Sequence, residues 1–240
     1  MEIKQIDRNR FLVTDKHYRD RVTSDWFDAK VLAEQGAIIG SSQGRSTTWF
    51  FQKNNEQFVL RHYYRGGFLS KWVQDSYLFT GIRRTRGYQE FSLLQQMYQK
   101  NLPVPEPVAF LVKKKGMLYH AWIIIRLIKD TEDLFHILQE RSLSADEWRG
   151  VGALIRHFHD EGIYHSDLNI HNILLDQQGH FWLIDFDKGR LFSKQSSKLQ
   201  ANLARLQRSL RKETTKNTGF NWREEEWSFL LEGYSADKAH

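Results

Sequence analysis

Two acidic residues and one asparagine are grouped in the second half of the chain. Asp167 and Asn172 lie in the segment IYHSDLNIHN, and Asp185 ends the later run FWLID. Between them, NILL and FWLID are predicted as short strands joined by the turn DQQG, so a hairpin brings the three side chains near one strand end. Converging carboxylate and amide oxygens form a hard, oxygen-rich site suited to Mg²⁺ and phosphates. Asp167, nearest the loop, could instead receive or orient the proton of a hydroxyl group.

The order of these residues is typical of a phosphotransferase loop. HSDLNIHN resembles the protein kinase catalytic loop H-R-D-L-x-x-x-N, with Asp167 at the base position and Asn172 at the metal position. DFD stands where kinases have D-F-G, and the 18-residue step from Asp167 to Asp185 has the kinase spacing. Asp187 replaces the glycine, and no A-P-E segment or phosphorylatable activation loop follows. We therefore expect constitutive phosphorylation of a small substrate, without the switch of a signalling kinase.

Four histidines close to this loop raise the alternative of a zinc site: His157, His159, His165 and His171. The first two are separated by two positions and point to different faces of a helix, whereas ligand pairs on a helix are three or four positions apart. The pattern therefore disfavours a histidine metal site. His165 is expected to brace the catalytic loop.

The elements that would position a nucleotide lie in the β-rich first third. The runs AIIG, STTWFFQ and QFVLRHYY predict two successive hairpins. GSSQG, residues 40–44, stands between the first two strands, where small residues (Gly40, Ser41 and Gly44) would let backbone amides approach a phosphate. This stretch does not fit G-x-G-x-x-G. The main argument for a phosphate-binding role is therefore its position in the chain, ahead of the other kinase-like motifs.

Arg61 lies on the strand FVLRHY, where a kinase has the lysine of V-A-I-K. Glu90, on the next predicted helix, is its natural partner. Arginine can contact the α- and β-phosphates of ATP and pair with Glu90, but as a planar fork. Without the downstream motif, a half-exposed surface ion pair would be the better explanation for both residues.

The segments after this strand alternate between helix and strand signals. GYQEFSLLQQMYQKN predicts an amphipathic helix, LPVPEPVAF an extended connector, and MLYHAWIIIRLI one or two buried strands. From residue 131 the pattern becomes helical, with a capping box at Ser144 and Glu147 and a stop at Gly162. The apolar stripe of the first helix comprises Phe91, Leu94, Met97 and Tyr98.

Composition narrows the class of protein further. The 240 residues contain no cysteine, which excludes disulfides and thiolate metal ligands and suits a reducing cytoplasm. The amino-terminal segment has no apolar signal core, and AWIIIRLI is too short to span a bilayer. A net charge of +6 favours a polyanionic partner, although a mildly basic surface without a special partner fits equally well.

Two segments could contact an anionic membrane surface. RGGFLSKWVQDSYLFTGIRRTR, residues 65–86, mixes aromatic and basic side chains: Phe68, Leu69, Trp72, Arg65, Lys71, Arg83, Arg84 and Arg86. A basic amphipathic helix near the carboxyl end has Leu199, Leu203, Leu206 and Leu210 on one stripe, with Arg205, Arg208, Arg211 and Lys212 off it. For that helix, packing within the protein is the better explanation.

Taken together, VLRHYYRGG, LPVPEPVA, HSDLNIHNILLD and WLIDFDKG resemble the lipopolysaccharide kinase family of the protein-kinase-like superfamily. The resemblance runs from about Gly40 to the carboxyl-terminal helix. It implies a two-lobed α+β fold, with an antiparallel sheet lobe carrying one main helix at 1–128 and a mainly helical lobe at 129–240. ATP would lie between the lobes and Mg²⁺ on Asn172 and Asp185. The nucleotide contacts would be Gly40, Ser41, Gly44, Arg61 and Glu90, with Asp167 as the catalytic residue.

The substrate expectation rests on the resemblance alone. It implies transfer of the γ-phosphate to the 4-hydroxyl of 3-deoxy-D-manno-octulosonic acid (Kdo) on a lipid A precursor. The protein would work peripherally at the cytoplasmic face of the inner membrane, on an anionic surface. A heptose or aminoglycoside acceptor is the nearest alternative. A basic pseudokinase that binds membrane or nucleic acid is less favoured, because Asn172 and Asp185 are both retained, and no nucleic acid partner is expected.

Overall fold

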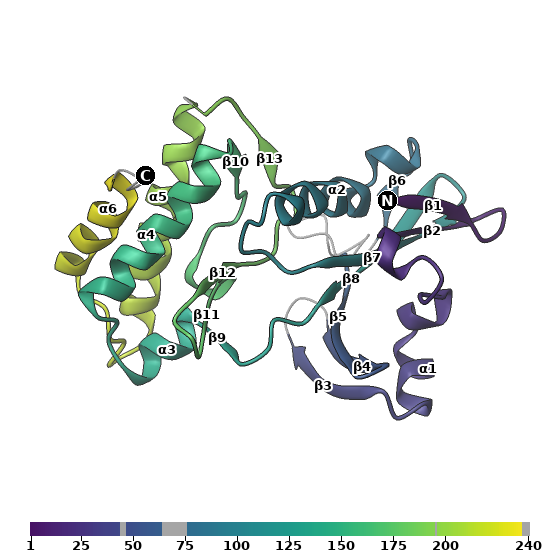
Figure 1. Ribbon diagram of the computed structural model, residues 1–240, viewed down its shortest axis with the longest axis horizontal. Coiled ribbons are helices and arrows are strands. Elements are labelled where there is room, and N and C mark those ends of the chain that lie inside the picture. Colours follow the sequence, from purple (N-terminus) through teal and green to yellow (C-terminus); the bar gives the residue numbers. More distant parts are fainter. Residues whose placement is uncertain (44–46, 64–75, 195, 237–240) are drawn as a thin grey trace. The chain divides into compact units, whose positions relative to one another are not determined.

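A computed structural model describes residues 1–43, 47–63, 76–194 and 196–236 (Figure 1). The chain divides into two compact units, and each is described by itself. Unit 1 comprises Met1–Tyr98 and Pro105–Leu127, and unit 2 comprises Gln99–Val104 and Ile128–His240. The first two prolines of the proline-rich segment therefore fall in different units.

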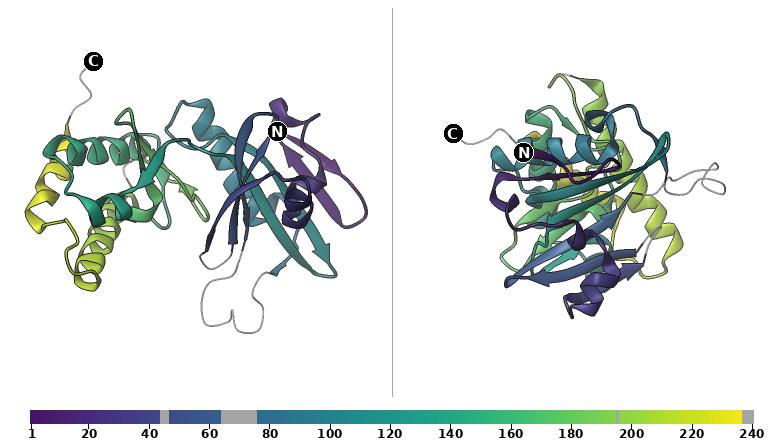
Figure 2. Two further views of the ribbon diagram at one scale, coloured as in Figure 1. Left: turned by 90° about the horizontal axis from the view of Figure 1, so that it is seen from below. Right: turned by 90° about the vertical axis from the view of Figure 1, so that its right-hand side faces the viewer.

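Unit 1 is built on one antiparallel sheet, whose strands twist along its length (Figure 2). The two predicted hairpins are confirmed, since β4 pairs with β3 on one side and with β5 on the other. Asn54 and Asn55 both have positive φ in the turn between β4 and β5, a conformation that asparagine tolerates well. In order across the sheet the strands are β1 (Glu2–Gln5), β2 (Arg10–Thr14), β7 (Pro107–Lys115), β8 (Leu118–Arg126), β5 (Glu56–His62), β4 (Thr47–Lys53) and β3 (Ile38–Gln43), while β6 (Tyr77–Leu78) pairs with β8.

Both faces of this sheet are covered. Helix α2 (Arg86–Gln99) packs Phe91 against Phe110, with ring centroids 5.3 Å apart. The other face buries Trp26 against Phe51 and Phe58. Trp26 comes from the amino-terminal segment, which contains η1 (Lys16–Tyr18), η2 (Ser24–Phe27) and α1 (Ala29–Glu34). Side chains of β7 alternate between the two faces of the sheet. The strand therefore contributes to the core under α2 and to the core under the amino-terminal segment.

Two details of the predicted elements were wrong. Tyr98 is 45% exposed although it lies four residues after Leu94, because it belongs to the last turn of α2, and the buried stripe ends at Met97. The proline-rich connector ends earlier than expected. Pro107 is the first residue of β7, a place where a missing backbone donor is tolerated.

Unit 2 is mainly helical, with two small sheets. Its helices are α3 (Leu134–Glu140), α4 (Ala145–Asp160), α5 (Ser197–Lys216) and α6 (Trp227–Ser235), with η5 at Ile170–Asn172 and η6 at Glu224–Glu226. Strand β11 (Ile173–Asp176) lies between β12 (Phe181–Leu183) and β9 (Thr131–Asp133), and β10 (Ile163–Tyr164) pairs with β13 (Arg190–Leu191). Together with the sheet of unit 1, these elements give a mixed α+β protein.

Helix α4 begins and ends where its sequence signals indicate. The capping box is confirmed: the Glu147 amide donates to Ser144 Oγ at 3.2 Å, and the Ser144 amide donates to Glu147 Oε2 at 2.7 Å. Gly162 follows the helix with φ +71°, and a Cβ there would lie 2.3 Å from the Phe192 carbonyl oxygen. Glycine is therefore required at this position both by conformation and by space.

Helices α4 and α6 cross at two glycines. A Cβ on Gly152 would lie 2.0 Å from the Leu230 carbonyl oxygen, and a Cβ on Gly233 would lie 2.0 Å from the Arg149 carbonyl oxygen. The two backbones are thus close enough that no side chain fits at either glycine.

Helix α5 packs its apolar stripe within unit 2, as the sequence analysis favoured. Leu199, Leu206 and Leu210 are buried, whereas Leu203 is only partly buried. Within the described residues, no helix combines the length and apolar character needed to cross a membrane.

Candidate active site

The hairpin predicted after the candidate catalytic loop is present. Strand β11 pairs with β12 in the register Ile173 with Leu183. One residue beyond this register, the Ile184 amide donates to the Asn172 carbonyl oxygen at 3.0 Å. Asp185 therefore leaves the hairpin beside the strand that Asn172 enters, and the sequence correctly placed these two candidate metal ligands at one strand end.

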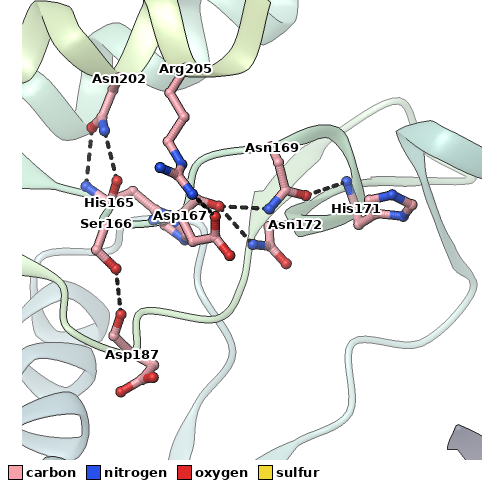
Figure 3. A network of polar contacts seen from close by, with 9 residues as sticks. All are labelled: His165, Ser166, Asp167, Asn169, His171, Asn172, Asp187, Asn202 and Arg205. Carbon is pink, nitrogen blue, oxygen red and sulfur yellow. Dashed lines mark hydrogen bonds and ion pairs between the residues drawn. The ribbon is translucent and has the colours of Figure 1, made fainter. Parts of the chain in front are cut away.

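Two side-chain amides hold the loop around Asp167 (Figure 3). The Asp167 carbonyl oxygen accepts hydrogen bonds from Asn169 Nδ2 at 2.8 Å and from Asn172 Nδ2 at 2.9 Å. Asn169 Oδ1 also accepts from the His171 amide at 2.9 Å, which caps η5. The loop is therefore fixed by its own asparagines.

These contacts decide which end of Asn172 is available. Because Nδ2 donates to the Asp167 carbonyl, the amide orientation is determined by its hydrogen bond. Asn172 Oδ1 accepts no hydrogen bond from the described residues. This oxygen lies near the segment that carries Asp185, and an amide oxygen close to a carboxylate is a suitable ligand set for a hard divalent cation such as Mg²⁺.

The segment that carries Asp185 is fixed on both sides. Asp185 has φ +62°, an uncommon conformation for a residue other than glycine, and such residues concentrate at functional sites. The next residue, Phe186, is fully buried against Phe158 and His165, with ring centroids 5.6 and 4.7 Å away. Ser166 Oγ donates to the Asp187 carbonyl oxygen at 2.5 Å. The loop around Asp167 and the DFD segment thus contact each other directly.

His165 braces the loop, as expected from the sequence. Its ring is buried, with Nε2 at 2.8 Å from the Ile184 carbonyl oxygen and Nδ1 at 3.2 Å from the Asp167 amide. Nε2 must donate to the carbonyl and Nδ1 must accept from the amide, so the ring is neutral in this arrangement. Burial lowers the pKa of His165, which agrees with a neutral ring.

Helix α5 supplies a clamp that the sequence analysis missed. Asn202 is buried, and its Oδ1 accepts from the His165 amide at 3.1 Å while its Nδ2 donates to the His165 carbonyl oxygen at 2.7 Å. His159 Nε2 lies 3.3 Å from the same Oδ1, and His159 Nδ1 lies 2.9 Å from the Tyr234 hydroxyl. The buried histidine of α4 is therefore part of this hydrogen-bond network.

One turn further along α5, Arg205 reaches the candidate catalytic carboxylate. Its Nη2 pairs with Asp167 Oδ1 (Figure 3). The side chains of Arg205 and Asp167 are 43% and 50% exposed, so this ion pair is accessible to solvent. Asp167 thus combines a fixed backbone with a carboxylate that an approaching substrate could reach.

Two of the four histidines near this site are held in hydrogen bonds. Among the residues that the structure describes, no group of three His, Cys, Asp or Glu side chains could hold a metal ion. His159 and His165 are committed to the hydrogen bonds above.

In unit 1, Arg61 and Glu90 form the expected ion pair. Glu90 is 3% exposed, and its other carboxylate oxygen, Oε2, accepts from the Tyr63 hydroxyl at 2.7 Å. The Arg61 guanidinium also lies 5.8 Å from the centroid of the Tyr63 ring. Glu90 and Tyr63 therefore both help to orient Arg61, and contact of Arg61 with a nucleotide phosphate stays a prediction.

The phosphate loop proposed at residues 40–44 needs correction. Gly40 and Ser41 are paired with Phe50 and Trp49 inside the β3–β4 ladder, so they belong to a strand and not to the turn. Strand pairing extended further than the Gly/Ser composition suggested, because the Thr and aromatic residues of β4 provide a strong partner. Gly44 lies outside the described residues.

A separate hollow of about 360 Å³ lies on the other face of this sheet. Leu60 and His62 line it and flank Arg61 on β5, so they point away from the face of Arg61. His62 stacks on Trp122 with ring centroids 4.5 Å apart. This hollow is therefore distinct from the Arg61–Glu90 pair.

The loop around Asp167, the amide oxygen of Asn172 and the adjoining Asp185 are groups that a phosphotransferase would use. The lipopolysaccharide kinase (Kdo/WaaP) family model matches residues 29–234, and the chain belongs to this family.

Curated relatives match along most of the chain. A 3-deoxy-D-manno-octulosonic acid kinase of Vibrio cholerae serotype O1 is 42% identical over 226 residues, covering 89% of this chain and 95% of the relative. The protein of that name from Mannheimia succiniciproducens is 42% identical over 221 residues, with coverages of 87% and 89%. That of Photobacterium damsela subsp. piscicida is 44% identical over 206 residues, covering 85% of each chain.

Asn202 left a signal in the sequence that could have identified it. It lies on the buried stripe of α5, three residues after Leu199 and four before Leu206, where a polar side chain needs a partner. Arg205 left no such signal, because it is one of several basic residues on the same helix.

Proposed function

We propose that this protein transfers the γ-phosphate of ATP to the 4-hydroxyl of Kdo on a lipid A precursor. The Kdo acceptor is taken from the names of the relatives, and the 4-hydroxyl from the resemblance seen in the sequence. The observation that carries the proposal is the loop in which Asn169 and Asn172 fix the Asp167 carbonyl group while the Asp167 carboxylate stays half exposed. The proposal includes that unit 1, with its sheet, and unit 2, with its helices, correspond to the two lobes of the protein-kinase-like fold.

Each residue has a role that its surroundings support. Asp167 accepts or orients the proton of the acceptor hydroxyl, since its carboxylate is half exposed and its backbone is fixed. Asn172 and Asp185 would hold Mg²⁺, which would neutralise charge on the phosphates when bound. Arg61, oriented by Glu90, contacts the α- and β-phosphates.

The test is the mass of a Kdo–lipid A precursor after incubation with the protein, ATP and Mg²⁺. The wild type should add one phosphate to this acceptor, and acceptors that carry heptose or aminoglycoside hydroxyls should remain unmodified. Transfer to one of those acceptors, without transfer to Kdo, would contradict the substrate assignment.

Two substitutions separate the proposed roles. Asp167→Ala should lower kcat by about 10²–10⁴-fold while ATP still binds, because proton transfer or hydroxyl orientation is lost. Asp185→Ala should abolish the Mg²⁺-dependent part of nucleotide binding. Asp20→Ala, at an 86% exposed side chain, is the control and should behave as the wild type. Unchanged turnover by the Asp167 variant would remove that residue from the mechanism.

The proposal includes peripheral attachment to an anionic membrane, where a lipid-anchored acceptor would be met. Arg83 and Arg84 are exposed in η4 (Ile82–Arg84) and are suited to this contact. Arg86 is less suited, because its Nη1 donates to the Tyr77 hydroxyl at 2.5 Å and its guanidinium lies 5.0 Å from the Tyr77 ring centroid. The membrane contacts predicted from the sequence at residues 65–75 lie outside the described residues. Among the described residues, the proposed contact surface is therefore η4.

Vesicle co-sedimentation tests this contact. Each basic residue near an anionic leaflet contributes about 1 kcal/mol, and salt screens the attraction. The wild type should bind anionic vesicles at low salt and dissociate at high salt, and Arg83→Ala/Arg84→Ala should bind more weakly. Equal binding by both proteins would exclude η4 as the contact.

A further inference from the structure

We propose that Arg205 binds the carboxylate of the acceptor sugar and so selects an acidic sugar over a neutral one. This inference rests on the proposed function, because it assigns a binding residue for the Kdo acceptor. Arg205 lies on α5, outside the catalytic loop and the hairpin that follows it.

The first argument is the unused hydrogen-bonding capacity of Arg205. One of its nitrogens, Nη2, pairs with Asp167 Oδ1, and Nε is buried without a partner. Arg205 makes no other ion pair or hydrogen bond within the described residues. Of the five N–H donors of a guanidinium, the two on Nη1 therefore remain for a second anion, whereas the buried Nε is closed to it. Since the side chain is 43% exposed, such an anion can reach it.

The second argument is electrostatic. An acidic acceptor that brings its hydroxyl to Asp167 also brings a carboxylate close to that negatively charged side chain. Like charges at such a separation repel each other, and more strongly where water is excluded. A cation already placed beside Asp167 removes this repulsion and attracts the acceptor. Arg205 is the cation paired with Asp167 in the structure.

The third argument is the chemistry of the acceptor. In a 3-deoxy-2-ulosonic acid, the carboxylate is attached to C2, and only C3 separates C2 from the carbon that bears the 4-hydroxyl. The two groups are thus near neighbours on one ring and must meet neighbouring side chains of the enzyme. Asp167 and Arg205 are such a pair. The planar fork of arginine matches a carboxylate in two parallel hydrogen bonds, whereas lysine is a point charge.

The ion pair would also be explained if Arg205 only positioned Asp167. Acceptors with and without a negative charge distinguish this positioning role from binding of the acceptor carboxylate. If Arg205 only positions Asp167, its loss lowers transfer to charged and neutral acceptors by the same factor. If Arg205 binds the acceptor carboxylate, its loss mainly lowers transfer to the acidic acceptor.

The experiment compares kcat/KM for a Kdo acceptor with that for the carboxamide of the same acceptor. The variants are Arg205→Ala and Arg205→Lys, with Arg208→Ala as the control, since Arg208 is exposed on the same helix. The wild type and the control should prefer the acid by about 10²-fold or more, because a site built to bind a group rejects an analogue that lacks it. Arg205→Ala should lose at least about tenfold of this preference, and Arg205→Lys should restore part of it.

Folding is checked separately by the thermal unfolding midpoint and by binding of ATP in each variant. Equal losses of kcat/KM on the acid and the carboxamide in Arg205→Ala would overturn the inference, as would a wild type with no preference for the acid. If the wild type phosphorylates neither acceptor, the proposed function itself fails, and this result is distinguishable from the others.

Discussion

Asn202 holds both main-chain hydrogen-bonding groups of His165, accepting from its amide at 3.1 Å and donating to its carbonyl oxygen at 2.7 Å. The two residues are 37 positions apart in the chain. Because His165 directly precedes Ser166 and Asp167, this pair of bonds ties the position of the candidate catalytic carboxylate to helix α5. The geometry of the site therefore depends on a helix that contains none of the catalytic motif.

Asn202→Ala should lower both stability and turnover. Its loss leaves the buried amide and carbonyl groups of His165 without partners, at a cost of about 1–3 kcal/mol in the free energy of unfolding. The catalytic loop should loosen, so kcat should fall while KM for ATP changes little. Urea denaturation and steady-state kinetics measure these effects. Gln200→Ala removes an exposed amide from the same helix and is the matched control. Equal effects of the two substitutions would contradict the clamp.

Arg61→Lys should be damaging although it keeps the charge. Arginine pairs with Glu90 through a planar guanidinium, whereas a lysine ammonium cannot reproduce this planar geometry. We expect kcat/KM for ATP to fall by roughly tenfold or more. Arg10→Lys, at the exposed ion pair with Asp7, is the control for the same exchange. Wild-type kinetics in Arg61→Lys would assign phosphate binding to another residue.

Stability should fall as the solution becomes acidic. Burial lowers the pKa of His165, so its ring stays neutral in the folded state, whereas an unfolded histidine takes up a proton below about pH 6.5. The unfolded state then binds more protons, and the free energy of unfolding decreases as the pH falls through this range. One such histidine contributes a slope of up to about 1.4 kcal/mol per pH unit.

His165→Gln tests this assignment. The variant should be less stable than the wild type at pH 7.5, because the ring and its contacts are lost, but its stability should depend less on pH between 7 and 5. His17→Gln, at an exposed histidine, should keep the slope of the wild type. His159, whose pKa is also lowered by burial, would account for a residual slope in the His165 variant. An unchanged slope would show that His165 does not contribute.

Gly152→Ala should destabilise unit 2 although alanine has the higher helix propensity. The added Cβ would lie 2.0 Å from the Leu230 carbonyl oxygen, so α4 and α6 would have to separate. We expect a loss of about 1–3 kcal/mol in the free energy of unfolding, typical of overpacking, despite the gain of about 1 kcal/mol in propensity. Ala153→Gly, at the exposed neighbour, should cost only about 1 kcal/mol. A more stable Gly152→Ala protein would show that the helix crossing is not tight.

The sequence by itself determined the features that depend on near neighbours. The spacing of Asn172 and Asp185 about a short hairpin, the capping box at Ser144 and the glycine stop at 162 were all predictable, because each depends on local backbone geometry. The Arg61–Glu90 pair was also anticipated, but only because the order of kinase motifs suggested it. Local signals failed at the edges of elements, as at Gly40 and Tyr98, where pairing and burial are decided by the neighbours.

Only the tertiary structure decided how the catalytic loop is held. Asn202 and Arg205 contact residues that are more than 30 positions away, and no periodicity in the chain encodes which buried amide or which arginine makes such a contact. Packing of the leucine stripe of α5 fixes the rotation of that helix, and this rotation directs Asn202 to His165 and Arg205 to Asp167. The sequence thus specified the chemical groups, and the packing of one helix specified their environment.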